Sequence, residues 1–226
     1  MEVFLIHTCP EREWYVREFL VPSLLDQGAK PESIRIWTDN DRLGNLFAWI
    51  KSVEEIHGEH GGTWHLQDDI VICHDFVERV RDYERKGNDV VQGFCCERFG
   101  PSPAYNGYVP VIFIWCGFPC IRIPNAFIKE FLSWFWEEAF YSDEYEDAIR
   151  LKRDDDRLFR DWLVRHHRGL YVYNTRPNLV DHVDYLLGGS LANRHREYVA
   201  RAEFFEDQYL VDSLADKLAT RASNAD

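Results

Sequence analysis

The segment WHLQDDIVICHDF (residues 64–76) decides how this chain is expected to fold. One apolar run ends at Leu66 and another begins at Ile70, and two adjacent aspartates, Asp68 and Asp69, stand near the junction. Short apolar runs of this kind are typical of buried strands. A strand that ends in two carboxylates needs a partner for them, because an unpaired buried charge is costly. That partner is a backbone turn, an arginine or a metal ion.

The chain before this segment alternates between strand and helix patterns. Residues 3–8 (VFLIHT) predict a buried strand and residues 33–39 (SIRIWTD) a second one. A helix is expected at about 12–26, with a kink or an early end at Pro22. Apolar residues at helical spacing predict another helix over 45–57.

The chain after it continues the alternation. The expected order is helix 75–86, strand 89–94, loop 97–108, strand 109–118, helix 124–140, helix 155–167, a last strand 169–175, a loop 176–190 and a helix 193–221. This order favours an α/β fold, with a mainly parallel sheet flanked by helices and a C-terminal helical extension. No repeat or linker is visible in the sequence. We therefore expect residues 1–192 to form one domain and residues 193–226 to be a helical extension of it.

The composition bounds the class of protein. The chain has 226 residues, of which 46% are hydrophobic and 15% aromatic, so a large core is available. No apolar run approaches the roughly 18–20 residues that span a bilayer, and the N-terminus lacks the basic residues of a signal peptide. We expect a cytoplasmic protein. Its six cysteines form no C-x-x-C pair and are expected to be reduced thiols.

The charge is uneven along the chain. A net charge of −13 disfavours a simple nucleic-acid-binding protein. Residues 150–168 nevertheless hold seven Lys and Arg against four Asp. This stretch is either a basic face for an anionic acceptor or a solvated helix face.

Polar side chains follow three predicted strands. His7 and Thr8 end the first, Asp39 ends the second, and Asp68 and Asp69 follow the third. Ligands of open α/β sheets bind beyond the carboxyl ends of the strands, so these side chains are expected to share one crevice. The aspartate pair either caps the next segment and accepts turn amides or binds a hard divalent cation such as Mg²⁺ or Mn²⁺.

Five segments in a fixed order resemble a known family. They are HTCPERE, IWTDNDRLGNLFAW, WHLQDDIVICHDF, FIWCGFPCIRIP and RPNLVDHVDYLLGGS. This series resembles small bacterial and phage glycosyltransferases of the GT-A type, which carry hLQDD or hLEDD where others have Asp-x-Asp, and a late P-S-L-V-x-H segment. The resemblance covers residues 3–190 and implies a GT-A-like, Rossmann-like sheet.

The resemblance implies a metal site. Asp69 matches the main carboxylate ligand of a divalent cation, Mn²⁺ or Mg²⁺, and His182 the late histidine that completes the site. Asp68 would contact the donor ribose or the water shell of the metal. Without the family pattern, His182 reads as a surface histidine of a loop. Gln67 departs from the pattern, because Asp-x-Asp would place a carboxylate there.

The resemblance also implies a donor site. His7, Thr8 and Arg12 match the first donor-binding loop, and Asp39 matches the acid that contacts the nucleotide, for which UDP is the first choice. Trp115 and Gly117 match the floor beneath the donor sugar. The alternatives are ordinary ones: His7 is a strand-end residue, Arg12 a surface arginine and Trp115 part of the core.

An acceptor-side group completes the implied site. Asp155 and Asp156 match an acid that binds the acceptor or takes the proton of its hydroxyl. Acids at the start of a helix are also favoured by capping and by the helix dipole alone. Both readings stay open.

The function expected from this reading is a metal-dependent hexosyl- or pentosyltransferase that moves a sugar from a nucleotide-sugar, UDP-sugar first, to an acceptor hydroxyl. The acceptor is a glycan, a small molecule or a modified DNA base, the last as in a phage DNA-modifying enzyme. Other readings are a nucleotidyltransferase and an inactive protein that binds nucleotide-sugars.

Overall fold

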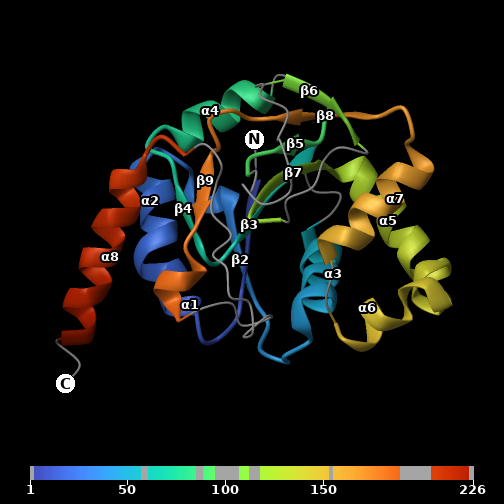
Figure 1. The fold of residues 1–226 in the computed structure, drawn as a ribbon, viewed down its shortest axis with the longest axis horizontal. Coiled ribbons are helices and arrows are strands. Elements are labelled where there is room, and N and C mark those ends of the chain that lie inside the picture. Colours follow the sequence, from blue (N-terminus) through green and yellow to red (C-terminus); the bar gives the residue numbers. More distant parts are fainter. Residues whose placement is uncertain are drawn as a thin grey trace.

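The computed structural model describes residues 3–56, 61–84, 89–94, 107–111, 118–152, 155–188 and 205–223. Within these residues, helices lie on both faces of a central sheet (Figure 1). None of the described helices combines the length and the hydrophobicity needed to cross a bilayer.

The central sheet has seven strands among the described residues. In spatial order they are β2 (Ile34–Thr38), β1 (Val3–Thr8), β3 (Gly62–Gln67), β7 (Cys120–Pro124), β5 (Val91–Gln92), β8 (Tyr171–Asn174) and β6 (Gly107–Pro110). β1 pairs in parallel with β2 and β3, and β5 with β8, whereas β7 and β6 run antiparallel to their neighbours. The predicted α/β fold with a mainly parallel sheet is confirmed.

Alternation along the strands builds a separate core on each face. In β1, Phe4 and Ile6 belong to one buried cluster and Leu5 to the other, since successive strand residues point to opposite faces. The first cluster is covered by α1 (Glu13–Tyr15), α2 (Val21–Asp26), α4 (Phe76–Glu84) and α8 (Gln208–Ser223). The second is covered by α3 (Gly44–Ile56), α5 (Asn125–Glu137), α6 (Glu146–Arg150) and α7 (Asp155–His166).

The first predicted helix continues past its proline. A π-helical turn over Val16–Leu20 joins α1 to α2, and Pro22 lies in the first turn of α2. A widened turn is one of the ways in which a helix accommodates a proline, which lacks the N–H donor. The helix therefore reaches Asp26 without the early end that the sequence allowed.

A small second sheet was not predicted. β4 (Ile70–Ile72) pairs antiparallel with β9 (Val180–His182), and Ile70 lies opposite His182. The expectation that residues 169–175 form the last strand and 176–190 a loop is therefore wrong. β9 has only three residues and its partner lies far earlier in the chain, so no local pattern marked it. β7 was also not predicted, and it adds an antiparallel strand to the middle of the sheet.

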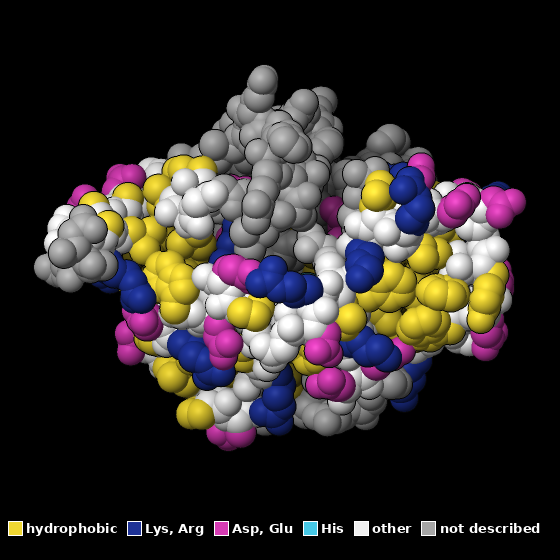
Figure 2. Space-filling view, turned by 90° about the horizontal axis from the view of Figure 1, so that it is seen from below, with side chains coloured by type: hydrophobic (Ala, Val, Ile, Leu, Met, Phe, Trp, Pro, Cys, Tyr) yellow, Lys and Arg dark blue, Asp and Glu magenta, His cyan; other side chains and the backbone are white. Residues whose placement is uncertain are grey.

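The basic stretch 150–168 does not form a free cationic face in the part that is described. Arg150 pairs with Asp147 at 2.7 Å, Arg160 with Asp161 at 2.9 Å, and Arg165 with Glu144. Figure 2 shows Lys and Arg interspersed with Asp and Glu on the face that it displays. The reading as a solvated helix face, rather than a surface for an anionic acceptor, fits these pairs.

Gly93 allows the central strands to approach closely, and we expect Gly93→Ala to destabilise the fold. An added Cβ would lie 2.6 Å from Cys120 Sγ and 3.2 Å from Leu179 Cδ1, both in fully buried residues. Overpacking of this kind costs about 1–3 kcal/mol, measurable as the free energy of unfolding in urea. The control is Gly61→Ala, where no described atom lies within 4 Å of the new Cβ. Equal stability of the two variants would contradict the packing described for the sheet.

Candidate functional site

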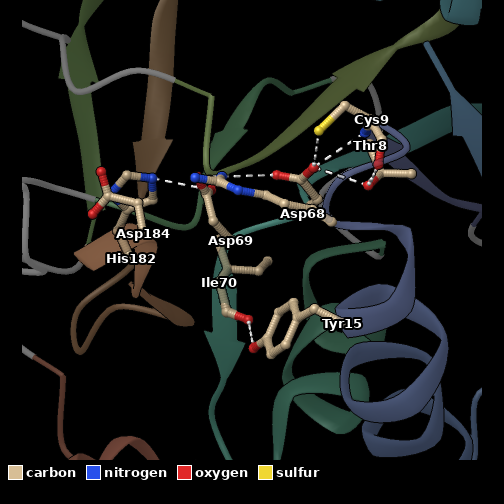
Figure 3. A network of polar contacts seen from close by, with 9 residues as sticks. Thr8, Cys9, Tyr15, Asp68, Asp69, Ile70, His182 and Asp184 are labelled. Atoms are coloured by element: carbon tan, nitrogen blue, oxygen red, sulfur yellow. Dashed lines mark hydrogen bonds and ion pairs between the residues drawn. The ribbon is translucent and has the colours of Figure 1, made fainter. Parts of the chain in front are cut away.

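The turn between β3 and β4 holds Asp68 and Asp69 against the start of the first helix. Figure 3 shows Asp68 and Asp69 at this turn, and the guanidinium of Arg12, the N-cap of α1, contacts both carboxylates. Arg12 Nη1 lies 3.2 Å from Asp68 Oδ1 and also contacts Asp69 Oδ2. All three residues are less than a tenth exposed. In this structure an arginine is therefore the partner that the two carboxylates share.

Asp68 is fully engaged by the first strand and its loop. Its Oδ2 accepts hydrogen bonds from Thr8 Oγ1 at 2.9 Å and from the backbone N–H of Cys9 at 3.3 Å. Its Oδ1 faces Arg12. Both carboxylate oxygens thus have protein partners. Through its hydrogen bonds to Thr8 and Cys9, Asp68 links the end of β3 to the end of β1.

Asp69 faces a histidine on its other side. Asp69 Oδ1 lies 3.0 Å from His182 Nε2. The backbone fixes this approach, because the carbonyl of Asp69 accepts from Val183 N–H at 2.7 Å in continuation of the β4–β9 pairing. Behind the ring, His182 Nδ1 lies 3.5 Å from Asp184 Oδ1. The short second sheet therefore places His182 beside the aspartate pair, and the turn that follows it adds the carboxylate of Asp184.

Burial and charge act in opposite directions on these groups. Burial raises the pKa of the Asp69 carboxyl, but His182 and Arg12 outweigh it and hold that pKa below its usual range. Burial and the neighbouring charge of Asp69 raise the pKa of Asp68 to about 6 against the pull of Arg12. Burial lowers the pKa of His182, but Asp69 reverses this and raises it to about 9. Without another ligand, His182 is an imidazolium at neutral pH.

Among the described residues, Asp69 and His182 could hold a divalent cation. Asp69 Oδ1 and His182 Nε2 converge, whereas Asp69 Oδ2 and both oxygens of Asp68 already have partners. A histidine that binds a metal usually donates its other ring N–H to a carboxylate; Asp184 Oδ1 is 3.5 Å from His182 Nδ1 here, near that position but without a hydrogen bond between the two atoms. One carboxylate and one imidazole suit Mn²⁺ better than Mg²⁺, which prefers oxygen ligands. Two protein ligands leave the other positions to a substrate or water.

A second cluster of possible metal ligands lies at the start of α4. The ligand atoms of Cys73, Asp75 and Asp207 lie within 4.8 Å of one another. Arg79 Nη1 is 3.8 Å from both Cys73 Sγ and Asp75 Oδ1, and His74 Nδ1 is 2.9 Å from Asp207. Burial also raises the pKa of the Cys73 thiol to about 12. These contacts tie the segment before α8 to the start of α4, and Arg79 and His74 already contact the carboxylates of Asp75 and Asp207.

Asp39 and His7, two further residues of the predicted donor site, lie at the same edge of the sheet and have structural contacts of their own. Asp39 accepts from Leu43 N–H at 2.8 Å and Gly44 N–H at 3.0 Å, and its own N–H donates to the Thr8 carbonyl. It therefore orders the entry to α3. The ring of His7 lies 5.7 Å from that of Trp37, and burial lowers the pKa of His7 to about 4, so this imidazole is neutral.

The acceptor-side residues begin α7. Asp155 is buried, and Asp156 Oδ1 accepts from the N–H of Arg157 at 2.7 Å, as expected of an acid in the first turn of a helix. The segment before α7 contacts the start of α3, where Leu46 N–H donates to the Lys152 carbonyl at 3.3 Å. Trp115 and Gly117 lie outside the described residues.

Three residues of the site were not singled out from the sequence. They are Cys9, Tyr15, whose hydroxyl donates to the Ile70 carbonyl at 2.7 Å, and Asp184. Asp184 follows His182 by two residues, a spacing that often returns a side chain to the same side of an extended segment. That spacing is a signal from which Asp184 could have been found in the sequence. The contact of Tyr15 depends on how the first helix packs, and no sequence pattern indicates it.

Comparison with known proteins assigns no family. No family model matches the chain, and no curated protein matches it. Among solved structures, A197 from STIV is 13% identical, with a TM-score of 0.38 over 57% of this chain and 68% of that one. A 2-C-methyl-D-erythritol 4-phosphate cytidylyltransferase from Thermus thermophilus is 14% identical, with a TM-score of 0.44 over 97% of this chain and 100% of that one. Likeness at this level does not transfer an activity.

We expect Arg12→Met to destabilise the protein strongly at pH 7. The substitution leaves two adjacent buried carboxylates without their shared cation, which costs about 3–5 kcal/mol. The pKa of Asp68, which burial and Asp69 already raise to about 6, rises further without Arg12, so the folded state binds more protons than the unfolded state and the variant regains stability as the pH falls from 7 to 5. Urea unfolding at both pH values measures this. Arg17→Met is the control, because Arg17 forms an exposed pair with Glu13 worth less than about 1 kcal/mol. An equal loss in both variants would refute the shared-cation arrangement.

Proposed function

We propose that this protein is a metal-dependent glycosyltransferase that moves a sugar from a nucleotide-sugar, with a UDP-sugar as the first candidate, to an acceptor hydroxyl. One observation carries the proposal. Asp69 and His182 meet at 3.0 Å at the carboxyl end of β3, with Asp184 behind the imidazole. The segments that supply these residues are the ones in which the sequence resembles GT-A enzymes.

The chemistry of the reaction accounts for the charges. Negative charge grows on the leaving nucleoside diphosphate as the glycosidic bond breaks, and a bound Mn²⁺ or Mg²⁺ supplies a Lewis acid that stabilises it. Asp69 Oδ1 and His182 Nε2 would hold this cation. A neutral His182 is required for that, so binding of the cation displaces a proton from the imidazole. Arg12 remains on Asp69 Oδ2 and keeps the aspartate in place.

Roles for the remaining residues follow from their positions. His7, Thr8 and Asp39 line the ends of β1 and β2, where we propose that the nucleotide binds. Asp68 holds this edge together through Thr8 and Arg12 and contacts the donor ribose in this proposal. Asp155 or Asp156 takes the proton of the acceptor hydroxyl. Trp115 and Gly117 keep their proposed place beneath the sugar.

The version in which the acceptor is a DNA base receives no support from the charges. The described arginines of residues 150–168 include Arg150, Arg160 and Arg165, and all three pair with nearby acids. DNA affinity that depends steeply on salt would reverse this judgement, because phosphate contacts release counterions.

The test is a thermal-shift panel of UDP-, GDP-, CDP- and dTDP-sugars with and without Mn²⁺. We expect one nucleotide class to stabilise the protein and Mn²⁺ to increase the shift. A ligand at about 100 times its dissociation constant adds roughly 2.7 kcal/mol, or on the order of 5–10 °C for a chain of this size. His182→Gln should remove the part of the shift that depends on Mn²⁺.

The matched control is His166→Gln, because His166 is exposed at the end of α7. It should respond to Mn²⁺ as the wild type does. Absence of any shift at millimolar ligand would refute the proposed function. An undiminished Mn²⁺ effect in His182→Gln would refute the assignment of the metal ligands alone.

A further inference from the structure

Three polar side chains lie in one register row of the central sheet. His65 of β3 is paired with Ile121 of β7, Ile121 with Gln92 of β5, and Gln92 with Asn174 of β8. Residues directly opposite in a ladder point to the same face. We call His65, Gln92 and Asn174 the polar row. Its members are 2–4% exposed.

The polar row lies on the face that α3, α5 and α7 cover. Ile121 belongs to the cluster on that face, as does Leu5, the partner of His65 in β1. The ring of Trp49 from α3 lies 6.1 Å from that of His65. The same face is apolar two residues earlier along the chain, at Val90 and Val172. On β5 and β8, polarity therefore begins on this face towards the carboxyl ends of the strands, whereas on β3 the same face is already polar at Thr63.

Every member of the polar row has a buried polar atom without a protein partner. In the described part of the structure, both ring nitrogens of His65, Oε1 of Gln92 and Oδ1 of Asn174 make no hydrogen bond. Buried polar atoms are nearly always satisfied, because leaving one unpaired is costly. Three such residues in one row indicate groups that a ligand satisfies rather than groups that hold the fold together.

The row offers neutral groups. Burial lowers the pKa of His65 to about 3, so its imidazole has one donor and one acceptor nitrogen. Gln92 and Asn174 present amide oxygens, and no charged residue stands between Leu5 and Gly107 in this row. Neutral donors and acceptors suit hydroxyl groups and do not suit a phosphate.

The row is close to the candidate metal ligands. His65 precedes Asp68 by three residues, roughly 10 Å along an extended chain. Phe94 follows Gln92 by two residues and its ring lies 6.2 Å from that of His182, but Phe94 packs in the cluster on the other face of the sheet. The row and the candidate metal ligands both lie towards the carboxyl ends of the strands, where ligands of open α/β sheets bind.

We propose that the polar row binds the hydroxyl groups of the donor sugar and sets which sugar is transferred. This inference rests on the proposed function. It assigns recognition of the sugar to side chains on the sheet, separate from the ends of β1 and β2 that would hold the nucleotide.

The test compares Gln92→Met and Asn174→Leu, which keep the approximate size of each side chain but remove the polar atoms. Asn125→Leu is the matched control, because Asn125 is also buried but its Oδ1 accepts from Thr63 Oγ1 at 3.2 Å. We expect Asn125→Leu to lower the melting temperature, and the two row variants to melt no lower than the wild type.

The ligands are UDP, UDP-glucose, UDP-galactose and UDP-N-acetylglucosamine, each with Mn²⁺. In the wild type, at least one UDP-hexose should bind more tightly than UDP. Each row variant should lose about twofold to tenfold of that advantage, the value of one hydrogen bond, and should bind UDP as the wild type does.

Three results would overturn the inference while UDP still binds. The first is that the row variants still bind a UDP-hexose more tightly than UDP by the same factor as the wild type. The second is that the wild type binds no UDP-hexose more tightly than UDP. The third is that the row variants melt at a temperature as low as that of Asn125→Leu. Failure of UDP and of all three UDP-hexoses to bind would overturn the choice of a UDP-sugar together with this inference.

Discussion

The pairing of Arg12 with Asp68 and Asp69 is the interaction on which the candidate site depends. Two carboxylates at the end of a central strand repel each other, and burial makes the repulsion worse. One guanidinium between them makes the turn after β3 possible. Because Arg12 begins the first helix and Asp68 also binds Thr8 and Cys9, the same interaction joins β1, β3 and that helix at one edge of the sheet.

The two basic side chains of the site lie on opposite sides of the Asp69 carboxylate. Arg12 serves one side of Asp69 and His182 the other, so the carboxylate has both a permanent partner and an exchangeable one. A guanidinium stays charged at all relevant pH values, whereas an imidazole can release its proton. This difference in chemistry fits our proposal that Arg12 holds the turn in place and that His182 binds a metal.

Much of the fold could be predicted because its elements are long or have a clear period. The strand 3–8, the helix 45–57 and the helix 155–167 correspond closely to β1, α3 and α7. β9 escaped prediction because three residues carry too little pattern. The sequence placed His7, Thr8, Asp39 and the aspartate pair at one edge, but it could not show that Arg12 lies between the carboxylates, since that depends on how the first helix packs. The unpaired atoms of Gln92 and Asn174 follow from strand register, which no local pattern reveals.

The pairing of β4 with β9 has a consequence for the order in which the site is assembled. A ribosome makes Arg12, Asp68 and Asp69 well before it makes His182, and these three groups are local to the first strands and helix. Until β9 pairs with β4, Asp69 has no histidine beside it, whereas Thr8, Cys9 and Arg12, the protein partners of Asp68, have already been made. The contacts among the first strands and helix can therefore form before the late segment is made, and the metal site that we propose is complete only once β9 has paired with β4.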